Sequence, residues 1–250
     1  MDSIIMSERC QSFAAEPRVW PRDASLNPSV TALVIIDMQR DFCKEGGYLS
    51  LQGYDIGPMR AIIPNIQRLL HVCREKSYPI FHTRQGNRPD LSDLHGRELD
   101  RSQQNPNAKG IGDLGPLGRI LVRGEAGHDT IPELYPHQGE PVVDKPGTGA
   151  FTYTDFDLLL RVKGVKNLIL CGVTTDVCVH STMREANDRG YDCLLVKDAC
   201  AATYQELHDF AIMSTKAEGG VFGAVSSVRC VIEGIEHGLE AEVYSLEQPN

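Results

Sequence analysis

Residues 167–190 read NLILCGVTTDVCVHSTMREANDRG, a pattern that predicts a buried strand, a sharp turn and a helix. The apolar run Leu168 to Cys171 is typical of a parallel strand covered on both faces, and Gly172 ends it. Thr175 or Asp176 is expected to cap the helix, which runs to the end of the stretch. This strand–turn–helix unit indicates an α/β protein with a parallel sheet.

The turn places Cys178 in the first turn of the predicted helix. Unpaired backbone N–H groups and the positive end of the helix dipole both favour a thiolate at such a position. We therefore expect the pKa of the Cys178 thiol to lie below that of a free cysteine. The alternative is a buried cysteine that packs as a small hydrophobic residue.

Strands and helices alternate on both sides of this unit. Strands are predicted at 31–38, 78–84, 141–146, 168–171 and 191–198, with a short sixth strand or turn at 219–223, and helices at 58–76, 154–163, 175–189, 204–218 and 228–235. This alternation predicts a three-layer, doubly wound α/β fold with a mostly parallel six-stranded sheet and right-handed crossovers. With the strand order 3-2-1-4-5-6, the first and fourth strands are neighbours, and ligands bind between their carboxyl ends.

A chain of 250 residues is long enough for one large core, and we predict a single domain over residues 31–240. Residues 1–30, which contain the only tryptophan, are expected to form an N-terminal arm, and residues 241–250 a polar tail. The stretch 85–138 is rich in Gly, Pro and charge, with few signals of regular structure. Because long structureless loops are unusual in compact domains, we expect short helices, a functional lid or a subunit contact there.

The composition argues against several classes of binding partner. A formal net charge of −9 without a basic stripe argues against nucleic acid or an anionic membrane. No apolar run approaches the ~20 residues of a membrane span, and no signal-peptide pattern opens the chain, so a cytoplasmic protein is expected. The eight cysteines are expected to be reduced, and the eight histidines show no metal-binding spacing, so neither a metal nor another cofactor is predicted.

Three side chains that can take part in a reaction follow predicted strands: Asp37, Lys145 and Cys178. In a doubly wound sheet their strand ends share one edge. A thiol, a carboxylate and an amine together suit covalent acyl transfer, because the thiolate attacks, the carboxylate moves protons and the ammonium stabilises both anions. Taken separately, Asp37 also fits a structural ion partner and Lys145 a solvated charge at a strand end.

Three separated motifs resemble those of the isochorismatase-like cysteine hydrolases: VIIDMQ at 34–39, DKP at 144–146 and GVTTDVCV at 172–179. The resemblance implies that Asp37, Lys145 and Cys178 are the catalytic triad. It also implies a cis peptide between Val173 and Thr174, with the N–H groups of Thr174 and Cys178 forming an oxyanion hole. Isochorismatases proper lack the nucleophilic cysteine, and the metal-binding pattern of nicotinamidases is missing here after the second strand.

Within this superfamily the chain most resembles the biuret hydrolases, and the ureidoacrylate amidohydrolases are the nearer alternative. The resemblance implies hydrolysis of a terminal C–N bond of biuret, or of a close N-carbamoyl amide, through an S-acyl intermediate. It also implies a homotetramer acting on a small urea-like amide. The candidate substrate contacts are Phe42, Phe151, Thr175 and Glu218. Glu218 stands where a glutamine is expected in biuret hydrolases, which bears on the substrate.

Two further classes remain as alternatives. Cys178 and Arg184 have the C-x5-R spacing of cysteine phosphatases, although the intervening residues contain no glycine and are predicted to be helical. A redox-sensing thiol without turnover is the other alternative, since an exposed cysteine of low pKa oxidises readily.

Overall fold

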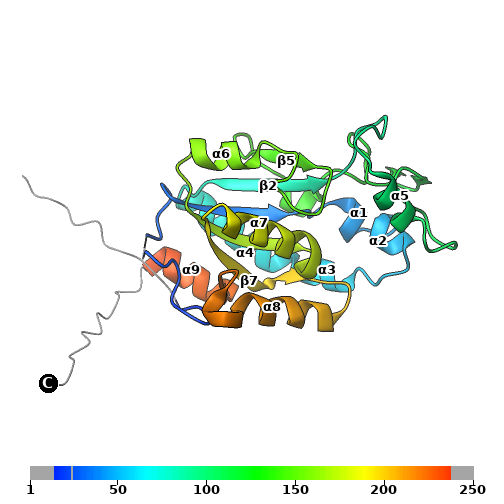
Figure 1. Ribbon diagram of the computed structural model, residues 1–250. Helices are drawn as coiled ribbons and strands as arrows, with labels where there is room; N and C mark the ends of the chain where they lie inside the picture. Colours follow the sequence, from blue (N-terminus) through cyan, green and yellow to red (C-terminus); the bar gives the residue numbers. More distant parts are fainter. Residues whose placement is uncertain (1–13, 24, 238–250) are drawn as a thin grey trace, which may run out of the picture.

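Six parallel strands form the central sheet of the computed structural model, which describes residues 14–23 and 25–237 (Figure 1). They are β1 (Thr31–Ile36), β2 (Ile80–Gln85), β5 (Val142–Lys145), β6 (Asn167–Val173), β7 (Asp192–Ala201) and β8 (Ala224–Ser226). Their order is β5-β2-β1-β6-β7-β8, and every neighbouring pair is parallel. The predicted doubly wound sheet with strand order 3-2-1-4-5-6 is therefore confirmed.

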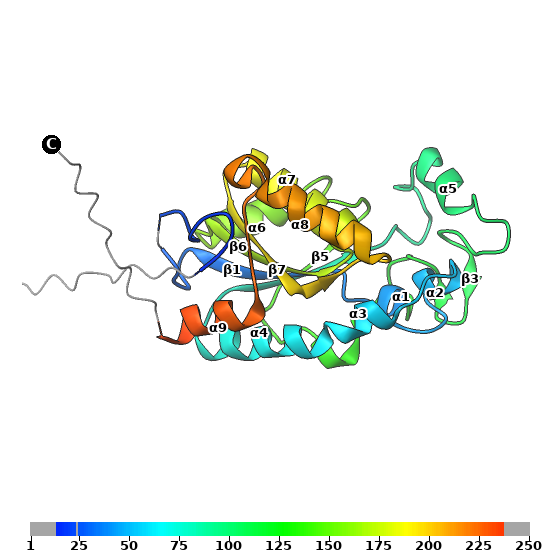
Figure 2. The same cartoon turned by 90° about the horizontal axis from the view of Figure 1, so that it is seen from below.

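Helices cover both faces of the sheet, as Figure 2 shows. α6 (Phe156–Val162), α7 (His180–Asp188) and α8 (Gln205–Gly220) lie on one face, and α4 (Ile63–Glu75) and α9 (Val228–His237) lie on the other. α3 (Gly57–Ala61) leads into α4, so the single helix predicted at 58–76 is broken at Ile62. Within the described part of the chain, no helix has the length and apolar character needed to cross a membrane.

The two central strands, β1 and β6, are buried along their whole length, which agrees with their apolar sequences. In their register Ile36 lies beside Gly172. A Cβ atom at Gly172 would lie within 3.0 Å of the Ile36 backbone, and Gly172 has a φ of 114°. Only glycine suits such a backbone. This close approach brings the end of β1 beside the turn that follows β6.

The backbone leaves helical geometry from Ala217 to Gly219, inside the bounds of α8, and a turn follows at 221–222. Of the two alternatives predicted for 219–223, a short strand or a turn, the turn is therefore the correct one, and the sixth strand, β8, begins after it. Gly219, Gly220 and Gly223 all have positive φ values, which explains the turn.

The described part of the N-terminal arm packs on its own domain. Trp20 is fully buried, Glu16 forms an antiparallel bridge with Val225, and Arg18 pairs with Asp192 at 2.9 Å. The predicted polar tail, residues 241–250, lies outside the described residues.

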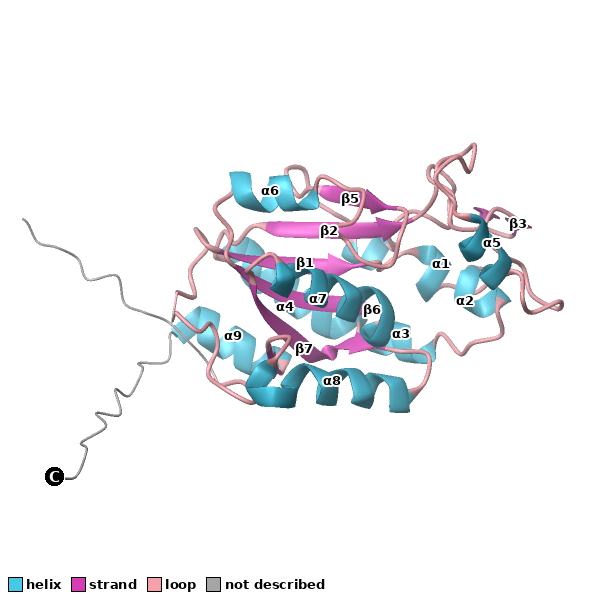
Figure 3. Ribbon diagram, viewed as in Figure 1, coloured by secondary structure: helices cyan, strands magenta, loops and turns pink. Residues whose placement is uncertain are grey.

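Much of the stretch 85–138 lies beyond the carboxyl ends of the strands (Figure 3), and its last residues return along α4, where the Glu133 carbonyl accepts a hydrogen bond from Gln67. It contains α5 (Gly96–Ser102), the small hairpin of β3 (Leu114–Gly115) and β4 (Gly118–Arg119), and the 3-10 helix η1 (Pro132–Leu134). α1 (Arg40–Cys43) and α2 (Tyr48–Leu51) lie at the same end of the molecule. The buried carboxylate of Asp41 accepts a hydrogen bond of 3.0 Å from the Leu121 N–H and joins this stretch to α1.

Candidate active site

Asp37 and Lys145 meet at the carboxyl edge of the sheet. Asp37 directly follows β1 with a φ of 52°, and Lys145 is the last residue of β5. The Lys145 Nζ lies 2.8 Å from the Asp37 Oδ2, and both side chains are fully buried. Thr83 donates a hydrogen bond of 2.7 Å to the Asp37 Oδ1. The carboxylate is thus oriented by two neighbouring strands.

The ammonium of Lys145 is satisfied on all sides. Besides Asp37, it donates hydrogen bonds of 2.9 Å to the carbonyls of Gly147 and Thr148. Burial alone would lower the pKa of Lys145, but the negative charge of Asp37 and the hydrogen bond to it outweigh burial and raise this pKa. Lys145 is therefore a fixed cation next to the thiol.

Cys178 completes the constellation, because its thiol lies close enough to Asp37 and Lys145 for both groups to act on its pKa. The side chain is buried, which raises the pKa of the thiol to about 12, although the Lys145 charge acts in the opposite direction. The expectation of a lowered pKa is therefore wrong for the free protein, since desolvation outweighs the helix terminus. Cys178 therefore rests as a neutral thiol, which would need a base to become a nucleophile.

The turn that carries Cys178 is tighter and more irregular than expected. A single π-helical turn, η2 (Thr175–Val179), precedes α7, and its first residue is capped by no side chain, so the predicted cap at Thr175 or Asp176 is wrong. The Thr174 carbonyl accepts hydrogen bonds from Val177 and Val179. The cis peptide at Val173–Thr174 is confirmed. Thr174 and Cys178 both line the pocket described next, and their role as an oxyanion hole stays a prediction.

A pocket of about 720 Å³ opens above the triad. Cys178, Thr174 and Gln85 line it at the sheet, and α5 contributes Arg97, Glu98 and Arg101. Its aromatic and aliphatic walls are Phe42, Tyr48, Leu49, Tyr54, Leu121, Val177, Tyr204 and Leu207. A second cavity of about 750 Å³ lies around Arg40 and Arg60 and is lined by no member of the triad.

The predicted substrate contacts are not all at this pocket. Phe42 lines it. Phe151 is not among the lining residues; its ring packs against Phe156 at 4.9 Å and lies under the Arg189 guanidinium. Thr175 is fully buried below the turn, where its hydroxyl pairs with the His208 Nδ1 at 2.8 Å. Phe151 and Thr175 are therefore buried residues that pack outside the pocket lining and do not face the substrate.

Glu218 is also placed away from the pocket. It is exposed near the end of α8, whose opposite end supplies Tyr204 and Leu207 to the pocket wall. At a helical rise of ~1.5 Å per residue, the distance along α8 from Leu207 to Glu218 is roughly 15 Å. The expectation that Glu218 contacts the substrate within one subunit is not supported by this position.

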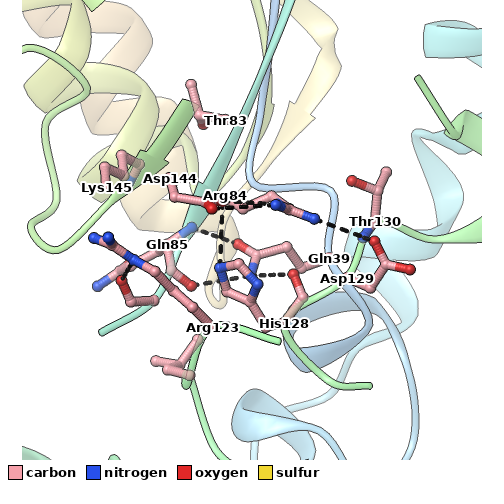
Figure 4. Close-up of polar contacts among 12 residues, drawn as sticks. Gln39, Thr83, Arg84, Gln85, Arg123, His128, Asp129, Thr130, Asp144 and Lys145 are labelled. Carbon is pink, nitrogen blue, oxygen red and sulfur yellow. Dashed lines mark hydrogen bonds and ion pairs between the residues drawn. The ribbon is translucent and has the colours of Figure 1, made fainter. Parts of the chain in front are cut away.

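The sequence reasoning missed Gln85, the last residue of β2. Its Oε1 accepts a hydrogen bond from the Cys178 Sγ at 3.3 Å. Gln39 holds the Gln85 backbone, and Figure 4 shows this network with His128 beneath it. The period of two along a strand puts Gln85 on the same face as Thr83, and this is the signal that could have found it.

The phosphatase alternative loses its geometric basis. Arg184 donates to the His180 Nδ1 at 3.1 Å and lies 4.0 Å from the centre of the Phe222 ring, and it is not among the pocket residues. No glycine loop surrounds Cys178, because η2 continues directly into α7. In the described ranges the cysteines are free, and no group of three or more His, Cys, Asp or Glu side chains is arranged to hold a metal ion.

Comparison with known proteins identifies the family of the chain. The family model of the isochorismatase domain matches residues 31–228. A ureidoacrylate amidohydrolase, RutB, from Rhizobium rhizogenes is 32% identical over 193 residues, which are 77% of this chain and 78% of the relative. A second one from Yersinia enterocolitica is also 32% identical, over 78% of this chain and 82% of its own length.

Solved structures show the same fold. A cysteine hydrolase from Pseudomonas syringae pv. phaseolicola is similar with a TM-score of 0.72 and 29% identity, covering 84% of this chain and 94% of its own. The N-carbamoylsarcosine amidase of Thermoplasma acidophilum has a TM-score of 0.59 at 21% identity, over 80% of this chain and 96% of its own, and supports the fold alone. With its buried Asp37–Lys145 pair beside Cys178, the chain belongs to the isochorismatase family and is one of its cysteine amidohydrolases.

Proposed function

We propose that the protein hydrolyses the terminal carbamoyl C–N bond of a ureido compound, with ureidoacrylate as the first candidate and biuret as the second. The observation that carries this proposal is the contact of Cys178 with the buried Asp37–Lys145 pair at the base of the pocket. A thiol, a proton carrier and a fixed cation are the groups that covalent amide hydrolysis needs.

The reaction begins with proton transfer from the Cys178 thiol to the Asp37 carboxylate, while Lys145 stabilises the thiolate. The thiolate adds to the carbamoyl carbon, and the N–H groups of Thr174 and Cys178 bind the oxyanion. Asp37 then gives its proton to the departing nitrogen, and ammonia leaves an S-acyl enzyme. Asp37 next takes a proton from water, the hydroxide attacks the S-acyl carbon, and the returning proton restores the thiol.

Two observations favour ureidoacrylate over biuret. Relatives named ureidoacrylate amidohydrolase match more than three quarters of the chain. The pocket of about 720 Å³ extends from Cys178 to Arg97 and Arg101 of α5 and leaves room beyond the carbamoyl group. Arg101 and Arg97 both pair with Glu98, Arg97 at 3.9 Å, so two arginines share one carboxylate and this side of the pocket can attract the carboxylate of a substrate. Biuret is neutral and compact, and it would use only the inner end of this pocket.

A substrate panel tests the proposal. Ammonia release is measured with ureidoacrylate, biuret, triuret and N-carbamoylsarcosine, using Cys178→Ala as the inactive control. We expect the highest kcat/KM for ureidoacrylate and no turnover by Cys178→Ala. A clear preference for biuret would restore the second candidate. Turnover of several of these amides by Cys178→Ala would contradict the nucleophile.

A homotetrameric state and a cytoplasmic location stay predictions. The exposed apolar side chains Tyr204, Phe210 and Met213 on α8 support self-association. Light scattering of the purified protein measures the oligomeric state directly.

A further inference from the structure

Gln85 touches the nucleophile without a part in the mechanism above. It is buried at the inner end of the pocket, and its Oε1 lies 3.3 Å from the Cys178 Sγ, which donates to it. An amide oxygen is a hydrogen-bond acceptor with no charge. It therefore stabilises the thiol, which has a proton to donate, and offers nothing to the thiolate.

Two hydrogen bonds between its backbone and the Gln39 side chain hold Gln85 in place. Its N–H donates to the Gln39 Oε1 at 2.7 Å, and its carbonyl accepts from the Gln39 Nε2 at 3.0 Å. The same Gln39 Nε2 also donates to the His128 carbonyl at 2.9 Å. Gln39 is fully buried, so its two hydrogen bonds to the Gln85 backbone are shielded from water (Figure 4). The side chain of Gln85 is thus left to serve the pocket, while its main chain is held elsewhere.

The thiol has a hydrogen-bond acceptor, Gln85, and a neighbouring base, Asp37, and the two lead to different outcomes. Transfer to Asp37 starts the reaction, whereas the hydrogen bond to Gln85 keeps the sulfur neutral. Asp37 is already engaged by Lys145 and Thr83. A carbamoyl group carries N–H donors that can replace the thiol as the partner of the Gln85 oxygen. Substrate entry would then free the thiol proton for Asp37.

We propose that Gln85 is a positioning residue that holds the Cys178 thiol in its neutral form in the free enzyme, and that a carbamoyl N–H of the substrate displaces the thiol from the Gln85 oxygen. The second half of this proposal rests on the proposed ureido substrate. The first half concerns the free enzyme alone.

Alkylation of Cys178 by iodoacetamide, followed by mass spectrometry, tests the first half without any substrate. Only the thiolate reacts, so the rate at a fixed pH below the thiol pKa reports the thiolate fraction. The rate is measured between pH 8 and 9 for the parent, Gln85→Leu, Gln85→Met and Gln85→Glu. The three variants keep the backbone hydrogen bonds to Gln39, and thermal unfolding checks that they fold.

The two kinds of variant are expected to act in opposite directions. Gln85→Leu and Gln85→Met remove the acceptor of the thiol, so alkylation should become about two- to tenfold faster. Gln85→Glu puts a carboxylate beside the sulfur, so alkylation should become at least about tenfold slower. A merely structural role would move all three rates together or leave them unchanged, and either result overturns the proposal.

Gln67 provides the matched control. It is exposed on α4 and donates to the Glu133 carbonyl, away from the pocket. Gln67→Leu and Gln67→Glu make the same chemical changes and should leave the alkylation rate within twofold of the parent. A shift of the same size in these controls would show that general charge or packing causes the effect, and would overturn the proposal.

Steady-state kinetics test the second half. With ureidoacrylate or biuret, Gln85→Leu should raise KM about tenfold, because the carbamoyl N–H loses its acceptor. An unchanged KM overturns the substrate part alone. If the parent hydrolyses no amide in the panel, the proposed function fails. The alkylation rates of the Gln85 variants, compared with the parent, still decide the role of Gln85 in the free enzyme.

Discussion

Lys145 and Asp37 form an ion pair from which water is excluded on every side, with 2.8 Å between the Nζ and the Oδ2. Each charge depends on the other, because neither has solvent to replace its partner. This pair ties the edge strand β5 to the central strand β1 across β2. The stability of the fold and the proposed catalysis therefore depend on the same two side chains.

The first prediction concerns this pair. Lys145→Met should destabilise the protein by about 3–5 kcal/mol, because it leaves a buried carboxylate without a counter-charge. Activity should be lost as well. Urea unfolding at pH 7 measures the first effect. Arg229→Met, which breaks the exposed Arg229–Glu233 pair, is the control and should cost at most about 1 kcal/mol. Equal costs for the two variants would refute this account of the site.

Gly172→Ala is expected to prevent normal folding. The added Cβ would press on the backbone of Ile36, and backbone cannot rotate away as a side chain can. The positive φ of Gly172 adds to the cost. Gly53→Ala is the matched control, since Gly53 also has a positive φ, of 88°, but its Cβ would meet no atom within 4 Å. Soluble yield and Tm of both variants check the difference, and a similar Tm for the two would contradict it.

Glu140 should make the protein sensitive to acid. Burial alone would raise the pKa of Glu140, but hydrogen bonds from Arg74 and His82 outweigh burial and hold this pKa well below its ordinary value. A carboxyl with a lowered folded pKa adds stability above its unfolded pKa, ~4.3, and the added stability is lost as the pH falls toward the folded pKa. Glu140→Gln should thus flatten the loss of stability below about pH 4. An unchanged pH profile of unfolding would count against this ion cluster.

Substitutions of Phe42 and Glu218 should have different effects on substrate binding. Phe42 lines the pocket, so Phe42→Ala should raise KM by about tenfold or more through lost apolar contact. Glu218 is exposed at the far end of α8, so Glu218→Gln should leave kcat and KM within twofold of the parent. A changed substrate preference in Glu218→Gln would mean that Glu218 reaches an active site in some other way, such as from a second subunit.

Local sequence patterns were sufficient for the scaffold. The apolar runs of β1 and β6 identified central strands, and the topology of such sheets brought Asp37 and Cys178 to one edge. Lys145 followed from the same rule, although its full burial was not apparent from a strand of only four residues. Strand-end chemistry was predictable because it depends on short-range pattern and on topology.

The features that depend on tertiary packing were not predictable in this way. The pKa of the Cys178 thiol follows from burial, which the turn sequence alone does not reveal. Gln85 reads as an ordinary polar residue at a strand end until its partner Cys178 is placed beside it. The path of the stretch 85–138 depends on single side-chain bonds, such as that between Asp41 and the Leu121 N–H, which leave no periodic signal.

The way this stretch leaves and rejoins the domain has a consequence for engineering. The Asn87 carbonyl accepts a hydrogen bond from the Arg123 N–H, and the Asn87 N–H donates to the Leu121 carbonyl, so the chain departs and returns at one point. Residues 88–120 therefore form a cassette with adjoining ends, and this cassette supplies the α5 side of the pocket. Cys178, Asp37 and Lys145 all lie outside it. Exchange of the cassette between relatives would therefore change the amide specificity and leave these three residues unaltered.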